Sequence, residues 1–150
     1  VANKMTFDIF KVYRDRLITK AITKPNGKFR VLKSRNIGNN EIVDIEGYDS
    51  YIDDINSLDV SKFLNQENCV LVPNLTYNPR ACMLPTGCIA DGSVAILTLK
   101  NANTKVSTED LAFYATSQFN EFYAIARNRG TRSLNIDNNS VFFFGKLKHA

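Results

Sequence analysis

The chain has few of the side chains on which most enzyme active sites depend. Its only histidine, His149, is the last residue but one, so a Ser/His/Asp triad has no base available in an ordered part of the chain. No glycine-rich phosphate loop occurs. The Asp/Glu-x-Lys triplet expected of a metal-dependent nuclease is also missing. We therefore expect no catalytic centre in this chain, and any enzyme activity of a longer parent protein lies elsewhere.

Cysteines and long apolar runs are also scarce. Cys69, Cys82 and Cys88 are an odd number for a disulfide framework and lack the paired spacing of a zinc site. We expect three reduced core thiols in a cytoplasmic protein, with no metal or other cofactor bound by this chain. No apolar run approaches the length of a membrane span, and the start does not resemble a signal peptide, so no membrane partner is expected.

What the chain does have suits a single folded domain. Its length is 150 residues and 44% of them are hydrophobic, which is enough for one core and argues against disorder. The sequence begins with Val1 and not with methionine. The prediction is one domain spanning residues 1–150, excised from a longer protein.

Charge is distributed unevenly along the sequence. Residues 1–35 carry ten Lys or Arg and two Asp, whereas residues 36–68 carry eight acids and one Lys. Residues 127–150 carry five bases and one acid. Two basic ends form one basic face if they meet in space, which favours a polyanionic partner. An ordinary solvated surface is the alternative.

Alternating and continuous apolar patterns predict many short strands. The expected strands are Lys28–Lys33, Glu41–Ile45, Cys69–Val72, Ala81–Leu84, Ser93–Leu99 and Val141–Phe144. The pattern over residues 7–22 is ambiguous between helix and strand, and residues 57–64 favour a short helical turn.

One helix of about twenty residues is expected late in the chain, because apolar residues recur on one face from Leu111 to Ala126. Ser107 is its expected N-cap and Gly130 its expected C′ residue. The resulting fold class is α+β: a curved, mostly antiparallel and partly closed sheet, with one long late helix and short helical turns.

Four polar loops flank the predicted elements, and we call them the 14–16, 33–36, 74–80 and 127–139 loops. They concentrate Arg, Lys, Asn, Ser and Thr, the side chains that reach phosphates and base edges. On spacing alone, a structural role is equally open, because Asn is a common turn residue, a tyrosine such as Tyr77 is usually half-buried, and cations favour helix C-termini. The candidate DNA-binding residues are Arg14, Arg16, Lys33, Arg35, Asn36, Asn74, Thr76, Tyr77, Asn78, Arg80, Arg127, Arg129, Thr131, Arg132, Ser133 and Asn135.

Over nearly its whole length, the chain resembles the C-terminal part of type II (type IIS-like) adenine-specific DNA methyltransferases of restriction-modification systems. The resemblance is carried, in order, by segments 14–16, 31–37, 73–80, 127–137 and 140–145. The layout is also similar to the target recognition domains of type I restriction specificity subunits. The methyltransferase core is missing, because neither a Phe-x-Gly-x-Gly loop nor an Asn-Pro-Pro-Tyr motif occurs.

The resemblance implies sequence-specific recognition of double-stranded DNA, which positions an adenine-N6 methyltransferase domain in cis, with or without a fused nuclease. S-adenosylmethionine would belong to that missing catalytic domain. No individual base contact is carried over from the family. Two alternatives from other classes remain: a small metal-dependent nuclease using Asp53 and Asp54, and a protein-interaction domain using the aromatic run Phe142–Phe144.

Overall fold

A computed structural model describes residues 3–75, 78–128 and 136–148, and within them the fold is α+β with mostly antiparallel sheets. The central sheet has four strands in the order β2-β8-β5-β6, and all its pairs are antiparallel. Its strands are β2 (Phe10–Tyr13), β5 (Val70–Pro73), β6 (Cys82–Met83) and β8 (Val94–Leu99).

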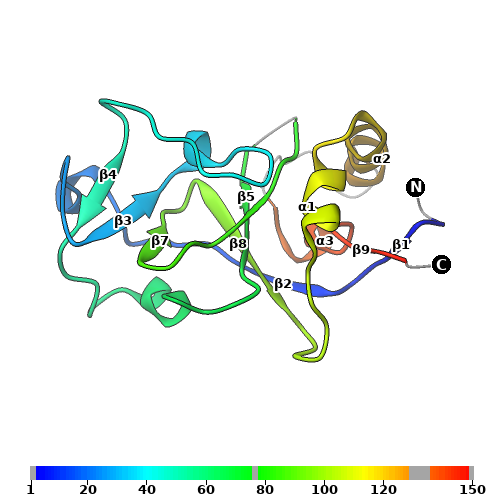
Figure 1. The fold of residues 1–150 in the computed structure, drawn as a ribbon, viewed down its shortest axis with the longest axis horizontal. Helices are drawn as coiled ribbons and strands as arrows, with labels where there is room; N and C mark the ends of the chain where they lie inside the picture. Colours follow the sequence, from blue (N-terminus) through cyan, green and yellow to red (C-terminus); the bar gives the residue numbers. More distant parts are fainter. Residues whose placement is uncertain (1–2, 76–77, 129–135, 149–150) are drawn as a thin grey trace.

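A second sheet of three strands lies to one side of the central sheet, at the left of Figure 1. It runs in the order β4-β3-β7, with β3 (Phe29–Leu32) antiparallel to β4 (Ser50–Ile52) and parallel to β7 (Cys88–Ala90). Near the two ends of the chain, β1 (Met5–Thr6) pairs with β9 (Lys146–Leu147). Because the described strands form separate ladders, the predicted partial closure of the sheet is not confirmed.

The α-helices lie on the opposite side of the central sheet from β3, β4 and β7 (Figure 1). They are α1 (Thr108–Tyr114), α2 (Ser117–Asn128) and α3 (Asn138–Val141). The described residues also form three short 3-10 helices: η1 (Lys20–Ile22), η2 (Ser34–Asn36) and η3 (Asp59–Phe63). None of the helices in the described ranges is long and apolar enough to cross a membrane.

The predicted N-cap of the late helix is confirmed, but the single long helix is wrong. Ser107 Oγ accepts from the Asp110 amide and the Asp110 carboxylate accepts from the Ser107 amide, which forms a capping box. The helix then ends at Tyr114. Thr116 Oγ1 donates to the Phe113 carbonyl at 2.7 Å and accepts from the Phe119 amide at 3.2 Å, so its side chain takes over bonds that a continuous helix would make. The predicted C′ residue, Gly130, lies outside the described residues.

Four strand predictions are confirmed with shifted ends, as β3, β5, β6 and β8, and the short helical turn is confirmed as η3. The ambiguous stretch 7–22 holds β2 and η1, whereas β4 and β7 were not predicted. The predicted strand Glu41–Ile45 is wrong, because it makes only an isolated bridge from Ile42 to Ile37. The predicted strand Val141–Phe144 is also wrong. Asp137 there accepts from the Asn139 and Ser140 amides and starts α3 instead.

The central sheet separates two apolar cores. Along β5, Val70 and Val72 face one core and Leu71 faces the other, as expected of a strand buried on both faces. The helix-side core contains an aromatic cluster around Phe119, whose ring centroid lies 5.2 Å from that of Tyr114 and 5.3 Å from that of Phe144. The sheet and its two cores give the polar loops a rigid base.

Candidate nucleic-acid interface

The turn between β7 and β8 joins three of the four polar loops. Ser93 Oγ accepts a hydrogen bond from the Ser34 amide at 3.0 Å, and the Ser93 carbonyl accepts from the Asn74 amide at 2.9 Å. On the same turn, a Cβ added to Gly92 would lie 2.5 Å from the carbonyl oxygen of Asp15. The 14–16, 33–36 and 74–80 loops therefore meet at this turn. This role of the turn was not predicted from the sequence.

The described end of the 127–139 loop is tied to the same place. Asn74 Oδ1 accepts from the Ile136 amide at 2.9 Å, and both residues are buried. From α2, Asn120 Nδ2 donates to Asn78 Oδ1 at 3.3 Å. The described parts of all four predicted loops are thus brought together, although they are far apart in the sequence.

Arg80 forms hydrogen bonds that connect the 33–36 loop with the 74–80 loop. Its Nε donates to the Ile37 carbonyl at 2.5 Å, and its Nη2 and Nη1 donate to the carbonyls of Ser34 and Asn78 at 3.3 and 3.4 Å. A guanidinium presents its donors in a fixed planar fork, so three carbonyl partners hold its orientation. Arg80 therefore connects η2 to the 74–80 loop.

Asn36 serves the scaffold. It is 0% exposed; its Oδ1 accepts from the Lys33 amide at 3.0 Å, and its Nδ2 donates to Val43 O at 2.9 Å and to Asp49 Oδ1 at 2.7 Å. An amide offers two donor hydrogens and one carbonyl oxygen, and each has a partner here. The Asn36 side chain is therefore buried and fully bonded within the fold, whereas a candidate DNA-binding residue was expected to lie at the surface.

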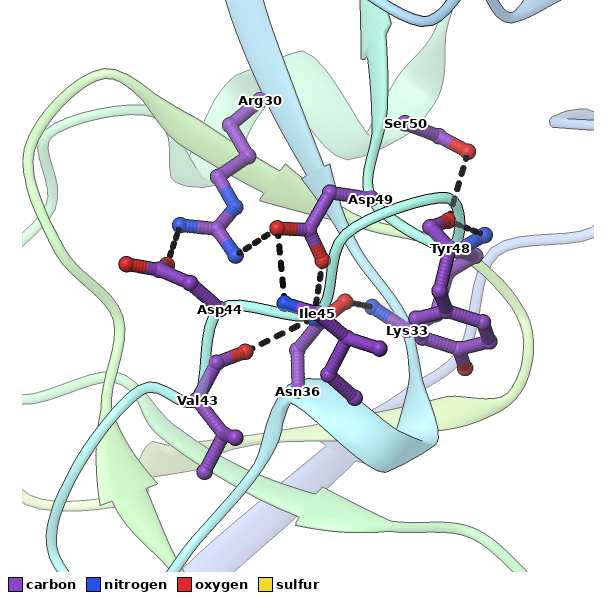
Figure 2. A network of polar contacts seen from close by, with 9 residues as sticks. All are labelled: Arg30, Lys33, Asn36, Val43, Asp44, Ile45, Tyr48, Asp49 and Ser50. Atoms are coloured by element: carbon purple, nitrogen blue, oxygen red, sulfur yellow. Dashed lines mark hydrogen bonds and ion pairs between the residues drawn. The ribbon is translucent and has the colours of Figure 1, made fainter.

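Figure 2 shows the polar network that surrounds Asn36. Arg30 lies between two carboxylates, with Nη1 2.6 Å from Asp44 Oδ1 and Nη2 3.1 Å from Asp49 Oδ2. Burial by itself raises the pKa of Asp49. Hydrogen bonds from Asn36 and from the Ile45 amide, together with the charge of Arg30, outweigh that effect and lower it below the usual value. The network fixes the 43–50 segment, which carries Tyr48.

Tyr48 holds two of the predicted cations. Lys33 Nζ donates to the Tyr48 carbonyl and lies 3.8 Å from the centroid of its ring (Figure 2). Arg35 Cζ lies 4.9 Å from the same centroid, and the Arg35 amide donates to the Tyr48 hydroxyl at 3.3 Å. Cation–π contacts orient both charges without neutralising them. Arg35 remains exposed to solvent.

A groove of about 680 Å³ opens beside this arrangement, and Lys33 also belongs to it. Its walls include two further lysines, Lys20 and Lys24, and the aromatic rings of Tyr48 and Tyr51. Lysine suits phosphate contacts and aromatic rings suit bases or sugars. Sequence reasoning missed Lys20, Lys24 and Tyr51. They lie close to Lys33 only because β3 pairs with β4, and the sequence does not show this pairing.

The surface charge is less one-sided than the sequence suggests. Among the described residues, three ion pairs join the basic first stretch to the acidic middle: Lys24 with Asp53, and Arg30 with both Asp44 and Asp49. The basic first stretch is therefore partly neutralised within the fold. Arg16, Lys20 and Arg35 remain exposed, so their charges stay at the surface.

The other predicted residues divide into two groups. Arg14 is half-buried and Arg16 exposed; between them the buried Asp15 accepts from the amides of Leu17 and Ile18, which fixes the turn. Arg127, also a candidate DNA-binding residue, is buried. The remaining candidates lie outside the described residues: Thr76, Tyr77, Arg129, Thr131, Arg132, Ser133 and Asn135.

The carboxylates proposed for a nuclease have local partners. Asp53 accepts from Lys24 Nζ and from the Lys28 amide, and these bonds, chiefly that from Lys24, lower its pKa. Asp54 accepts from the Asn56 amide at 2.9 Å. Among residues 3–75, 78–128 and 136–148, no group of three His, Cys, Asp or Glu is placed to hold a metal ion.

A scan of the sequence against protein-family models finds no match, and a search of curated proteins finds no significant match.

Proposed function

We propose that this chain binds double-stranded DNA and acts as the target recognition domain of an adenine-N6 DNA methyltransferase in a restriction-modification system. The methyltransferase catalytic domain is its partner in cis, and S-adenosylmethionine belongs to that domain. A fused nuclease is compatible with this arrangement. The family resemblance set out above suggests this role.

The observation that carries the proposal is the convergence of the four polar loops around the turn that holds Gly92 and Ser93. A recognition surface needs several polar loops held rigidly side by side, so that phosphate contacts fix the register and other side chains reach the bases. The Lys33–Tyr48–Arg35 arrangement and the adjoining groove supply cations and aromatic rings at the same place. These features support a nucleic-acid interface.

Binding of the purified chain to a labelled DNA duplex tests the proposal, with fluorescence anisotropy measured between about 50 and about 200 mM salt. Arg16→Ala and Arg35→Ala should each weaken binding and lower the slope of log affinity against log salt by about one unit. Lys105→Ala is the matched control, because it also removes one exposed charge but lies in the segment before α1. If all three variants weaken binding equally, the binding is non-specific attraction between charges and not recognition by this interface.

Two further measurements separate the proposal from its alternatives. The chain alone should neither transfer methyl groups from S-adenosylmethionine nor cleave DNA with Mg²⁺, and cleavage would favour a nuclease. The protein-interaction alternative has one favourable observation: Phe142 is 40% exposed while its ring stacks on Phe7 at 5.7 Å. Phe142→Ser should leave DNA affinity unchanged if DNA is the partner.

A further inference from the structure

A buried polar cluster is formed by residues of α2 and α3, and two nitrogens of its guanidinium have no hydrogen-bond partner. Tyr123 and Arg127 are one helical turn apart on α2, and the guanidinium carbon lies 5.7 Å from the Tyr123 ring centroid. Ser140 is on α3. All three are at least nine-tenths buried, with Arg127 7% exposed.

The unsatisfied atoms are Nε and Nη1 of Arg127, the hydroxyl of Tyr123 and the hydroxyl of Ser140. No carboxylate of the described residues forms an ion pair with Arg127. Asp137 is the acid whose charge acts on Tyr123 of this cluster, but its Oδ1 accepts from the amides of Asn139 and Ser140. Buried guanidinium nitrogens without an acceptor are unfavourable, so this cluster calls for an anion.

The three side chains act on one another electrostatically. Burial raises the pKa of Tyr123 to about 12, and the charge of Asp137 adds to that rise, while the Ser140 hydroxyl and the charge of Arg127 oppose it. All three groups can donate hydrogen bonds, and the guanidinium can only donate. Such a set suits an anion with several oxygen atoms better than it suits a neutral ligand.

The third guanidinium nitrogen, Nη2, does not belong to the atoms that are both buried and without a hydrogen-bond partner. Both edges along which a guanidinium binds an oxyanion bidentately include Nη2, paired with either Nε or Nη1. An oxyanion bound along either edge therefore engages Nη2 together with one of the two buried, unpartnered nitrogens. We propose that Tyr123, Arg127 and Ser140 form a binding site for a phosphate oxyanion.

The position of the site relates it to the four polar loops. On the same helix, Asn120 contacts Asn78, and four residues before Ser140 the Ile136 amide bonds to Asn74. The phosphate group thus comes either from the backbone of bound DNA or from free phosphate. Only the first source rests on the proposed function, so the two are separated below.

Thermal melting of the chain in sodium phosphate, against sodium chloride at equal ionic strength, tests the site. Phosphate at about one hundred times its dissociation constant should raise Tm by about 5–10 °C, and chloride should not. In Arg127→Met, which keeps a long apolar stem, the phosphate-specific shift should disappear. A phosphate shift no larger than the chloride shift, or one that persists in Arg127→Met, would overturn the proposal.

Two milder variants keep the test decisive if Arg127→Met does not fold. Tyr123→Phe and Ser140→Ala each remove one hydroxyl, and each should weaken phosphate binding about 5- to 10-fold, measured by ³¹P line broadening. Asn139→Ala, an exposed neighbour on α3, should leave it unchanged. If neither hydroxyl variant weakens binding, the cluster is not the site.

Competition with DNA identifies the source of the phosphate. If the DNA backbone supplies it, free phosphate should displace the duplex more strongly than chloride at equal ionic strength, and Tyr123→Phe should weaken DNA binding. If free phosphate is the ligand, the Tm shift should persist while DNA affinity responds to ionic strength alone. A chain that binds phosphate but no DNA would refute the proposed function and leave this site standing.

Discussion

The side-chain oxygen of Asn74 accepts a hydrogen bond from the Ile136 amide at 2.9 Å across 62 residues of sequence. Both residues are buried, so neither group has water as an alternative partner. This one contact fixes the end of the 127–139 loop against the 74–80 loop. The arrangement of the candidate interface therefore depends on a side chain that does not itself face the solvent.

Asn74→Ala should lower the free energy of unfolding by about 1–3 kcal/mol, because it leaves the buried Ile136 amide without an acceptor. Urea unfolding monitored by circular dichroism measures the change. Asn26→Ala, in an exposed turn, is the control and should stay within about 0.5 kcal/mol of wild type. Equal stability of the two variants would show that the contact contributes nothing.

Gly92→Ala tests the turn at the centre of the interface. The new Cβ would lie 2.5 Å from the Asp15 carbonyl oxygen, so the turn or the 14–16 loop has to move. We expect a loss of about 1–3 kcal/mol in stability and a weaker affinity for duplex DNA at a temperature where the variant is still folded. Thr86→Ala, in an exposed turn on the other side of β7, should change neither property. If Gly92→Ala is destabilised but its DNA affinity is unchanged, the 14–16 loop is not part of the DNA interface.

The sequence predicted best those elements whose pattern is local. The strand Val94–Leu99 begins with four consecutive apolar residues, 94–97, which alternate between the two cores, and this pattern can be recognised without knowledge of distant partners. The long helix failed because Thr116 has a side chain that competes for backbone bonds. At the end of the chain, the Asp137 cap outweighed the strand preference of the aromatic residues after it.

The candidate site was predictable only in part, for a related reason. Polar loops are visible in the sequence, but the residue that joins them, Ser93, makes its contact 59 residues away at Ser34. Tertiary contacts also decide whether an arginine is bonded within the fold or exposes its charge at the surface. Arg80 bonds to three carbonyls and Arg127 is buried, whereas Arg35 is exposed. Nothing in their immediate sequence distinguishes these three cases.

Asp110 should make stability depend on pH. Its side chain is 1% exposed and accepts from Lys146 Nζ at 2.9 Å and from the Leu147 amide at 2.8 Å. Burial raises its pKa, but hydrogen bonds from Ser107, Lys146 and Leu147 outweigh that effect and lower it. A folded-state pKa below the unfolded value of about 3.9 contributes stability above that pH, and the contribution is lost as pH falls through the folded-state pKa.

Asp110→Asn should therefore cost about 2–3 kcal/mol near neutral pH, because bonds to a charged acceptor are lost. The difference from wild type should shrink as the pH is lowered below about 4, measured by urea unfolding across that range. Glu109→Gln, an exposed acid in the same helical turn, is the control. A penalty that is constant with pH would mean that packing, not charge, is what Asp110 contributes.

The cysteines should differ in reactivity with alkylating reagents. Burial raises the pKa of Cys69 to about 11 and that of Cys82 to about 12, so almost no thiolate forms at either site near neutral pH. Cys88 is only partly buried; burial raises its pKa as well, and the charge of Arg30 opposes that rise. Iodoacetamide followed by peptide mass analysis should label Cys88 first in the folded protein, and all three at similar rates in urea. Faster labelling of Cys82 in the folded protein would contradict the buried position of β6.

Substitutions of Arg80 test whether this residue positions neighbouring loops or contacts a phosphate. Arg80→Lys keeps the positive charge but loses the fork that reaches the carbonyls of Ile37 and Ser34. If Arg80 only positions η2, both Arg80→Lys and Arg80→Ala should cost about 1–2 kcal/mol of stability. Both should then weaken DNA binding to a similar degree and leave the salt slope unchanged, since no ion contact has been removed.

If Arg80 instead contacts a phosphate, Arg80→Ala should lower the salt slope by about one unit, and Arg80→Lys, which keeps the charge, should leave the slope unchanged. Urea unfolding and anisotropy on the same three proteins therefore decide between the two roles, and the carbonyl contacts of Arg80 favour the first.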